Sequence, residues 1–304
     1  MVALTPLHQS QRTDCARPIE YRRRVRTAQS GEPSTKEFSV TTMNAQLSEV
    51  ADLVSTVGWA IAKNRLDPDQ IHSARTLITA HFAAGGGVLH GEAQVQPAAA
   101  HFVPGLSWLY AHPQVVELAR SALGTRDIIF TGHSDAHQGF APGWHKDSGS
   151  EALGDSLCGY FGESPEELFT GPPEVVKVGI YLQDSTSDNC LRVDPKSHLR
   201  PHVQPVSPAQ VLMDAGDLVV FDVRITHAGA VTPEPDSPQL TALRERVSAF
   251  VTFGRNTQRT KRFSQANMAR QRDQLSQTEG GAPAADAGHV ALLVSQGVGQ
   301  WQES

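Results

Sequence analysis

Histidine and aspartate stand two residues apart at two places in the stretch "TGHSDAHQGFAPGWHKDSGS", residues 131–150. The first pair is His133 with Asp135, and the second is His145 with Asp147. On an extended strand, residues i and i+2 share a face with Cα atoms about 6.5–7 Å apart, so their side chains can converge on one ion. Imidazole nitrogen and carboxylate oxygen are ligands for iron and zinc. Each pair is therefore a candidate for a metal site, and the surrounding sequence must decide between them.

The first pair extends to a third polar residue, His137. On one extended strand His133 and His137 would lie about 13 Å apart. With metal–nitrogen bonds of about 2 Å, that span is at the limit of what two imidazoles can reach around one ion. We therefore interpret His133, Asp135 and His137 as a polar strand that lines a cavity, and not as a self-contained metal site.

The second pair follows a Gly-Phe-Ala-Pro-Gly turn and needs a third ligand from elsewhere in the chain. The best-placed histidine is His227, at the end of "AGDLVVFDVRITHAGA", where a Gly-Asp turn leads into an apolar strand. A lone histidine at a strand end is usually structural, and a strand-borne His-x-Asp pair strengthens its claim to be a ligand. The residues alone leave open which pair binds a metal and which metal that is.

The segments around these residues have the patterns of helices and strands. Apolar spacing predicts helices over 47–57, 67–87 and 109–124, with Asp67 as N-cap of the second and Gly124 at the end of the third. Short β-branched runs bounded by turns predict strands, and those without intervening helices favour an antiparallel sandwich or barrel over a doubly wound sheet. The predicted strands are residues 126–138, 174–184, 190–195, 217–227 and 246–254, and a last helix is predicted over 260–277.

The chain divides into three parts by composition. Residues 1–42 are basic and polar and are predicted to be a disordered tail. Residues 43–280 carry the patterned segments and are predicted to form a single folded domain, which is long enough to bury a substantial core. Residues 281–304 form a weakly specified C-terminal segment.

Charge and composition exclude several classes of function. The formal net charge is −6, so no overall positive field favours nucleic acid or an anionic membrane. The sequence has no apolar run long enough for a transmembrane helix and no secretory signal. Three scattered cysteines indicate reduced thiols. We expect a cytoplasmic enzyme with no nucleic-acid or membrane partner, and the oligomeric state is not specified.

Four segments, in this order, resemble the phytanoyl-CoA dioxygenase family of non-haem iron(II), 2-oxoglutarate-dependent oxygenases. They are "GWHKD", "VVKVGIYLQDSTSDNCLRVDPKSH", "AGDLVVFDVRITHAGA" and "RVSAFVTFG". The resemblance covers residues 105–255 and depends on the combination, because no single piece is specific. It implies a mainly β fold with flanking helices, the double-stranded β-helix (jelly roll, cupin-like), and makes residues 43–280 an Fe(II)/2-oxoglutarate oxygenase domain.

The resemblance also implies the chemistry of the site. It assigns the iron(II) ligands to His145, Asp147 and His227, and it leaves His133 and Asp135 as residues of the cavity wall. Two histidines and one carboxylate on one face of an octahedral ion leave three positions, which the family uses for 2-oxoglutarate and O2. The carboxylate at Asp147 favours hydroxylation or another oxidation over halogenation, because related halogenases carry a small residue there.

An arginine of the family binds the far carboxylate of 2-oxoglutarate, since a planar guanidinium suits bidentate recognition. Arg244 and Arg246 are both expected on one face of the last predicted strand. We assign the role to Arg246, because Phe253 follows it by seven positions, as in the family. The separation of 19 residues between His227 and Arg246 is longer than usual, and the Pro-rich stretch 232–242 is predicted to be an inserted loop.

Two further expectations concern the wall of the site. Gly229 stands where some family members have a hydroxyl that helps to hold 2-oxoglutarate, so another donor is needed. Lys177, Tyr181 and Thr131 are the candidates for that donor. Trp144, beside the second His-x-Asp pair, is expected to point to the opposite face of its strand and pack in the core.

The segment 148–174 is long, acidic and contains Gly, Pro and Ser. We interpret it as either a solvated loop or a lid whose carboxylates would favour a cationic or polyhydroxylated amine. No basic groove suggests a CoA thioester, so the expected substrate is a small metabolite or an intermediate of natural product biosynthesis. The alternative is a non-catalytic jelly-roll protein that binds a small molecule, and a zinc hydrolase is a weaker third. The substrate, the carbon attacked and the oxidative outcome are not specified by the sequence.

Overall fold

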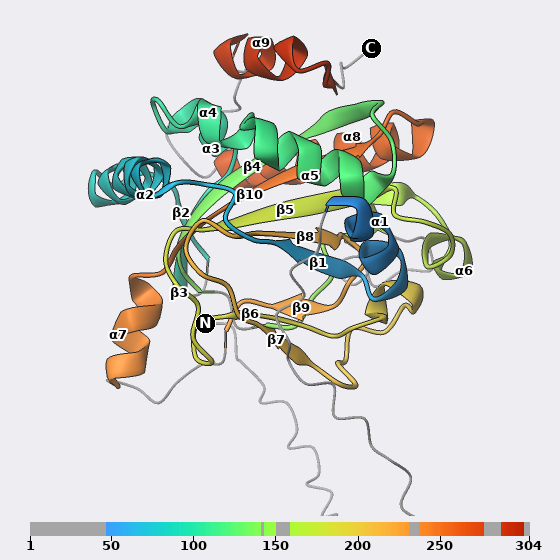
Figure 1. The fold of residues 1–304 in the computed structure, drawn as a ribbon, viewed down its shortest axis with the longest axis horizontal. Helices are drawn as coiled ribbons and strands as arrows, with labels where there is room; N and C mark the ends of the chain where they lie inside the picture. The colour runs from blue at the N-terminus through green and yellow to red at the C-terminus, as the bar shows by residue number, and fades with distance from the viewer. Residues whose placement is uncertain are drawn as a thin grey trace, which may run out of the picture. The chain divides into compact units, whose positions relative to one another are not determined.

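The computed structural model describes residues 47–90, 92–140, 143–149, 159–230, 237–276 and 287–300 (Figure 1). The tail predicted for residues 1–42 lies outside the described residues. The described parts all belong to one unit of the chain, Val40–Ser304.

The helices and strands predicted over the ranges given above are present in the predicted order, although the strand predicted over 217–227 is interrupted after Asp222. The Pro-rich stretch 232–242, predicted as a loop, differs, because the helix Pro238–Arg244 begins within it. The helical elements are α1 (Leu47–Thr56), α2 (Pro68–Ala83), α3 (Ala99–Phe102), α4 (Ser107–Tyr110), α5 (Pro113–Leu123), α6 (Pro165–Leu168), α7 (Pro238–Arg244), α8 (Gln258–Leu275), α9 (Ala287–Ser295) and the 3-10 turns η1 (Gly159–Phe161) and η2 (Ser197–Leu199). The strands are β1 (Trp59–Ala62), β2 (Val88–His90), β3 (Glu92–Gln96), β4 (Ile128–Phe140), β5 (Val175–Tyr181), β6 (Leu191–Val193), β7 (Ala209–Val211), β8 (Leu218–Asp222), β9 (His227–Ala228), β10 (Val247–Arg255) and β11 (Gly299–Gln300).

The strands form two sheets that together make the predicted double-stranded β-helix. The large sheet has the order β1-β8-β5-β10-β4-β3-β2, with β11 added beside β4, and the small sheet has the order β7-β6-β9. All of these pairings are antiparallel except that of β11 with β4. In Figure 1 the small sheet lies below the large one, on the side away from α1 and α5.

The large sheet has two chemically different faces. One face is covered by α1, α2 and α5, with apolar side chains packed between the helices and the strands (Figure 1). On β10, Ala249 and Val251 belong to this core. Their neighbours Ser248, Phe250 and Thr252 line a cavity on the opposite face. Because a strand places alternate residues on opposite faces, the same strands supply both the core and the cavity wall.

Local signals in the sequence explain where the covering helices begin and end. At the start of α2, the Asp67 side chain accepts a hydrogen bond from the Gln70 backbone N–H, and the Gln70 side chain accepts one from the Asp67 N–H. This capping box satisfies two amide groups that have no partner within the helix. At the end of α5, Gly124 has φ 62°, the left-handed conformation that glycine adopts without steric cost. Both caps are confirmed predictions.

A buried ion pair ties the strand that leads to His227 to the segment before β5. The side chains of Arg224 and Asp222 are 2% and 0% exposed, and Nη2 of Arg224 lies 2.6 Å from Oδ2 of Asp222. The two terminal nitrogens of Arg224 also donate hydrogen bonds to four backbone carbonyls within residues 168–172. A guanidinium has five N–H groups in one plane, and Nη2 shares its two between the Asp222 carboxylate and the carbonyls of Gly171 and Pro172.

We expect Arg224→Met to lower the free energy of unfolding by about 3–5 kcal/mol, because Asp222 would keep a buried charge without its partner. Chemical denaturation measures the change. The matched control is Arg126→Met, which removes a side chain that is 82% exposed and lies 3.4 Å from Glu117. This surface pair is expected to contribute less than about 1 kcal/mol. Equal stability of the two variants would contradict the role given to Arg224.

Candidate metal centre and its cavity

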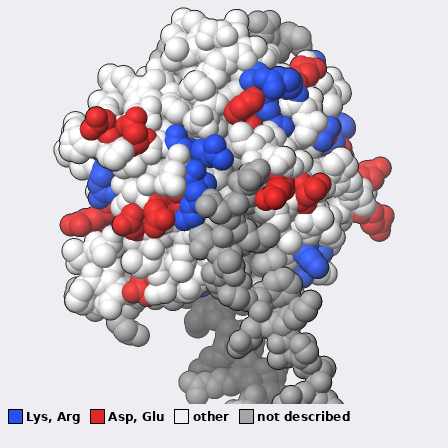
Figure 2. All heavy atoms as spheres, viewed as in Figure 1, with Lys and Arg blue, Asp and Glu red and all other residues white. Residues whose placement is uncertain are grey.

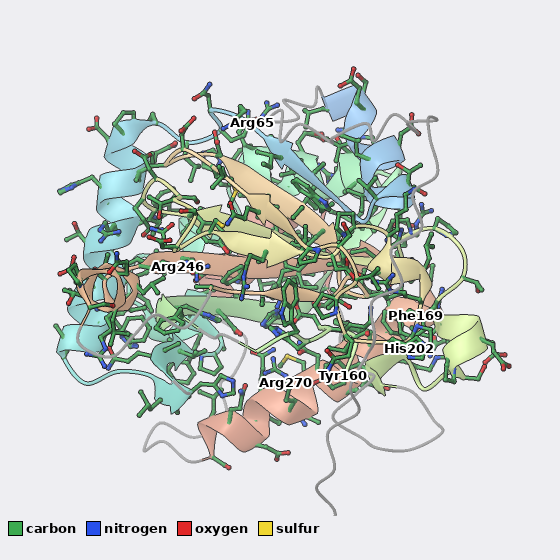
Figure 3. The ribbon with its side chains drawn as sticks, turned by 90° about the horizontal axis from the view of Figure 1, so that it is seen from below. Arg65, Tyr160, Phe169, His202, Arg246 and Arg270 are labelled. Atoms are coloured by element: carbon green, nitrogen blue, oxygen red, sulfur yellow. The ribbon has the colours of Figure 1, made fainter. Side chains whose placement is uncertain are left out.

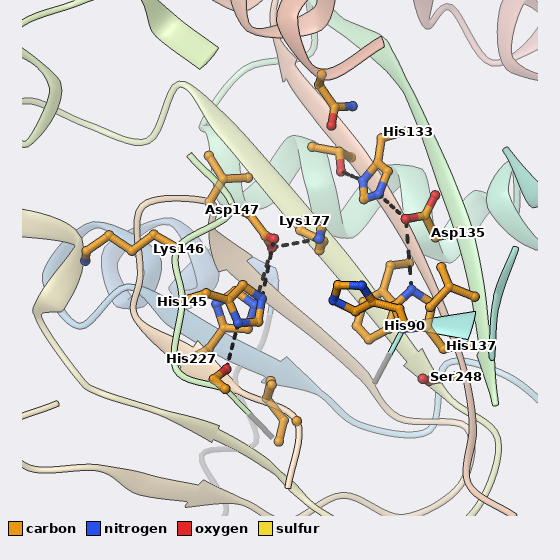
Figure 4. Close-up of a pocket in the computed structure, with 18 of the residues that line it drawn as sticks. His90, His133, Asp135, His137, His145, Lys146, Asp147, Lys177, His227 and Ser248 are labelled. Carbon is orange, nitrogen blue, oxygen red and sulfur yellow. Dashed lines mark hydrogen bonds and ion pairs between the residues drawn. The ribbon is translucent and has the colours of Figure 1, made fainter. Parts of the chain in front are cut away.

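The structure brings the side chains of His145, Asp147 and His227 together (Figure 4). One candidate ligand atom from each residue lies within 4.8 Å of the other two. Among the residues that the structure describes, no other set of three His, Cys, Asp or Glu side chains meets this geometry. The three residues that the family resemblance selected therefore lie close enough together to hold one metal ion.

Backbone hydrogen bonds hold these side chains in place. The His145 N–H donates to the His227 carbonyl and the His227 N–H donates to the His145 carbonyl, both at 3.0 Å, which makes an isolated antiparallel bridge. Next to it, the Ser148 N–H donates to the Val223 carbonyl at 2.9 Å. Between the two candidate ligands, the Lys146 ammonium donates to two backbone carbonyls at 2.7 Å each. The segment is thus fixed on both sides of Asp147.

The prediction of a regular strand at this His-x-Asp pair is wrong. His145 is a single bridge residue and Asp147 lies in a turn. The prediction for Trp144 is wrong for the same reason, because strand alternation does not extend to it. Trp144 is half-buried, lines the cavity and lies with its ring 5.0 Å from the guanidinium of Arg192. The side chain of Lys146 is buried instead, and Lys146 is 6% exposed.

The two imidazoles are oriented in the same way. Nδ1 of His145 lies 2.9 Å from the Gly143 carbonyl, and Nδ1 of His227 lies 3.1 Å from the Ile225 carbonyl. Because a carbonyl oxygen only accepts hydrogen bonds, each Nδ1 carries the proton and donates it. Each Nε2 then keeps its lone pair, which is the form in which histidine binds a metal.

Burial and neighbouring charges set the protonation states. Burial is the main cause that lowers the pKa of His227 to about 3, and His145 and Lys177 lower it further, although Asp147 opposes them. Burial alone would raise the pKa of Asp147, but the Lys177 ammonium and the two imidazoles hold that pKa well below its usual range. At neutral pH His227 is therefore neutral and Asp147 is ionised, as metal ligation requires.

Arg246 lies in the same cavity and is 4% exposed. It donates hydrogen bonds to the Gly229 carbonyl at 3.1 Å and to the Tyr181 hydroxyl at 2.7 Å. Its Nε has no hydrogen-bond partner among the described residues. Arg244, expected on the same strand face, is instead the last residue of α7 and is exposed. Of the two arginines, only Arg246 offers a buried guanidinium donor to a ligand in this cavity.

The cavity has a volume of about 740 Å³ and is lined by residues of both sheets, of η1 and of α8. Drug-sized ligands occupy pockets of about 300–1,000 Å³, so the cavity has room for a small molecule. Of the three candidate donors, Lys177 and Tyr181 line the cavity. Thr131 is completely buried and donates its hydroxyl hydrogen to the Thr252 carbonyl, outside the lining.

Sequence reasoning missed the contribution of α8 and η1. Phe263, Asn267, Arg270 and Gln274 of α8 line the cavity together with Tyr160 of η1. Figure 3 shows Arg270 and Tyr160 close together below the sheets. The four α8 residues follow the i, i+4, i+7, i+11 spacing of one helix face, which is visible in the sequence. That spacing could have shown that the four residues share one face of the helix, but not that this face lines the cavity.

His133, Asp135 and His137 line the same cavity without joining the candidate metal ligands. Figure 4 shows them apart from the His145 side chain, with Lys177 drawn between the two groups. Nζ of Lys177 lies 2.7 Å from Oδ2 of Asp147. These three residues are therefore a second polar group in the wall of the cavity.

The described acids of the segment 148–174 do not line the cavity. Glu163 lies 2.7 Å from a guanidinium nitrogen of Arg259. Glu167 closes the capping box of α6, and Glu174 accepts a hydrogen bond from a threonine of the chain that leads into α8. Residues 150–158 of the segment lie outside the described residues.

On the face drawn in Figure 2, the described residues include charged side chains of both signs, which are interspersed and form no continuous basic track among them. Within the described residues, no helix combines the length and the apolar character that crossing a membrane requires.

Comparisons with solved structures confirm the fold. The epimerase SnoN, in complex with Fe3+, alpha ketoglutarate and nogalamycin RO, is 16% identical with a TM-score of 0.52 over 69% of this chain and 84% of SnoN. The carbocyclase SnoK from nogalamycin biosynthesis is 18% identical with a TM-score of 0.52 over 71% of this chain and 86% of SnoK. HygX from Streptomyces hygroscopicus, with nickel and 2-oxoglutarate bound, is 13% identical with a TM-score of 0.51 over 70% of this chain and 88% of HygX.

No curated protein matches the sequence. The profile of the family described as phytanoyl-CoA dioxygenase (PhyH) matches residues 57–232, which is more than half of the chain. This range contains the three candidate metal ligands and every named strand of the two sheets except β10 and β11. The chain belongs to the phytanoyl-CoA dioxygenase (PhyH) family of 2-oxoglutarate-dependent, non-haem oxygenases.

Proposed function

We propose that this protein binds iron(II) through His145, Asp147 and His227 and uses 2-oxoglutarate and O2 to oxidise a C–H bond of a small molecule. The observation that carries the proposal is the convergence of these three side chains in one cavity with the buried guanidinium of Arg246. Two imidazoles and one carboxylate on one side of an ion are the ligand set of non-haem iron(II) oxygenases.

The three residues fit iron(II) in chemistry as well as position. Both imidazoles have Nδ1 committed to a backbone carbonyl, so both can offer Nε2. Asp147 is ionised, and its Oδ2 lies 3.4 Å from Nε2 of His227. Bound iron(II) with 2-oxoglutarate supplies the oxidising chemistry, in which O2 is consumed and succinate and CO2 are released.

Arg246 is proposed to hold the far carboxylate of 2-oxoglutarate. Its guanidinium stacks at 4.8 Å on the ring of Tyr181 and donates to that hydroxyl, so its plane is fixed before any ligand enters. A fixed planar guanidinium loses little entropy when it binds a carboxylate. Tyr181 therefore orients Arg246. Tyr181 is also proposed as the donor that replaces the hydroxyl absent at Gly229.

Lys177 is proposed to orient Asp147. Its Nζ lies 2.7 Å from Oδ2 of Asp147 and 5.6 Å from the centre of the Phe250 ring. Hydrogen-bonded partners of this kind fix metal-binding side chains and change metal affinity by about 10–100-fold when removed. Aromatic side chains around the cavity, including Trp144 and Phe263, help to exclude water from the reacting region.

The proposed substrate is a small metabolite or an intermediate of natural product biosynthesis. SnoN and SnoK carry this fold and are described as an epimerase and a carbocyclase, so the fold is compatible with several oxidative outcomes. The amine suggested by the acidic segment has no support from its described carboxylates, because none lines the cavity. The non-catalytic alternative is not favoured, because a complete ligand set and a buried guanidinium donor lie in one cavity.

Mixing the protein with iron(II) and 2-oxoglutarate without oxygen is expected to give a weak visible charge-transfer band, and admitting O2 is expected to give succinate. His145→Ala should remove both signals, because a lost ligand should weaken iron binding by more than the roughly 100-fold attributed to an outer partner. His133→Ala is the matched control and should keep the band. Absence of the band and of succinate in the unaltered protein would refute the oxygenase proposal.

Arg246→Lys is expected to raise the 2-oxoglutarate concentration needed for half of the full band by about tenfold or more, because an ammonium cannot reproduce the planar fork. Anaerobic titration measures this value. Arg244→Lys is the matched control, since Arg244 is exposed at the end of α7, and it should leave the titration unchanged. If both variants titrate alike, another residue binds the cosubstrate.

A further inference from the structure

Several buried polar atoms on the cavity wall lack a hydrogen-bond partner among the described residues, and two of them belong to β4. They are Oδ1 of Asp135 and Nε2 of His137. The side chain of Asp135 is 7% exposed, so its free carboxylate oxygen is almost completely removed from water. Nε2 of His137 lies 3.9 Å from the other oxygen, Oδ2, which is too long for a hydrogen bond. Leaving such atoms unpaired costs stability, so each calls for an explanation.

A β-bulge directs His133 into the cavity beside them. The pairing of β4 with β10 shifts register at this point, and Gly132 has φ 84°. The positive φ favours glycine here, and an added Cβ would lie 2.2 Å from Sδ of Met268, so that side chain would have to move. Gln271 of α8 donates to the Gly132 carbonyl at 3.2 Å and holds the bulge. Bulges near active sites commonly re-aim a side chain, here His133.

His133 in turn fixes one oxygen of Asp135. Nε2 of His133 lies 2.6 Å from Oδ2 of Asp135, and Nδ1 of His133 lies 2.6 Å from the Thr252 hydroxyl. The carboxylate only accepts, so His133 donates from Nε2 and accepts from Thr252 at Nδ1. Thr252 is completely buried, so this Thr-His-Asp chain positions a carboxylate and does not present a nucleophile. It leaves Oδ1 of Asp135 as the free acceptor.

We propose that Asp135 and His137 form the part of the cavity that binds the substrate, and that they bind a hydroxyl group of it. The hydroxyl donates to Oδ1 of Asp135 and forms its second hydrogen bond with Nε2 of His137. This proposal rests on the proposed oxygenase function and adds the substrate class, a hydroxylated small molecule.

The surrounding charges favour a hydroxyl over an ammonium. Burial is the main cause that lowers the pKa of His137. Asp135 opposes this shift, and the positive charges of Lys177 and Arg246 add to it. Burial alone would raise the pKa of Asp135, but His133 and His137 hold it well below its usual range, and the charge of Arg270 adds to their effect. An ammonium would meet this positive surrounding and can only donate hydrogen bonds. A hydroxyl both donates and accepts, so it satisfies Asp135 and either tautomer of neutral His137.

The test uses the full protein with iron(II), 2-oxoglutarate and O2, and a panel of small polyols and cyclic alcohols. Each compound is matched by an analogue that lacks one hydroxyl and by one with an amino group in its place. Succinate release above the rate without added compound is expected for hydroxylated members. Removing the bound hydroxyl should lower kcat/KM by about tenfold or more, because Asp135 and His137 would be left unpaired.

Asp135→Asn keeps the size of the side chain and removes its charge, and it should raise KM for the best compound by about tenfold. The anaerobic charge-transfer band should stay unchanged, because Asp135 is not a metal ligand. Asp127→Asn is the matched control, an exposed aspartate just before β4, and should change neither signal. The analogue comparison uses the unaltered protein, so it stands even if Asp135→Asn does not fold.

The outcomes separate this proposal from the oxygenase function. The band and basal succinate could be present while removal of a hydroxyl lowers kcat/KM for no compound, or while amino analogues are preferred. Either result would refute the proposed hydroxyl site and leave the oxygenase function standing. An Asp135→Asn variant with the KM of Asp127→Asn would also refute the hydroxyl site. If the unaltered protein gives neither band nor succinate, the oxygenase function fails and the proposal falls with it.

Discussion

Two backbone hydrogen bonds between His145 and His227, each 3.0 Å long, are the contact on which the rest of the site depends. They place two segments that are far apart in the chain face to face, so the imidazole centroids lie 4.3 Å apart. Each Nδ1 is then satisfied by a carbonyl two residues earlier, so the backbone fixes both the position and the tautomer of the rings. Bringing the segments together costs loop entropy, which the packing of the two sheets must offset.

The two faces of the central strands have different roles, because alternate side chains point to opposite faces. One face of β10 and its neighbours is apolar and packs against helices, which provides the stability of the fold. The other face holds His133, Asp135, Lys177 and Arg246, whose burial costs free energy wherever their hydrogen bonds are incomplete. The apolar packing on the opposite face of the same strands offsets the cost of this polar wall.

The sequence predicts most of the elements because their signals are local. Asp67 caps a helix and Gly124 ends one through contacts within a few residues, and both could be recognised directly. The metal candidates could be selected by motif order. Trp144 could not be placed, because its orientation depends on an isolated bridge to a distant segment. The bulge at Gly132 and the contact of α8 with the cavity also arise from tertiary packing, which no local pattern records.

The position of Lys177 connects the two polar groups electrostatically. In the structure its charge is balanced by Asp147 at 2.7 Å and by the face of Phe250. A metal ion bound to Asp147 would neutralise part of the charge of that carboxylate, so less negative charge would remain to balance Lys177. The region between the two groups would then become more positive, with Arg270 adding to it and Asp135 as the opposing carboxylate. Loading the metal would therefore strengthen the proposed preference of this cavity for neutral, hydrogen-bonding substrates over cationic ones.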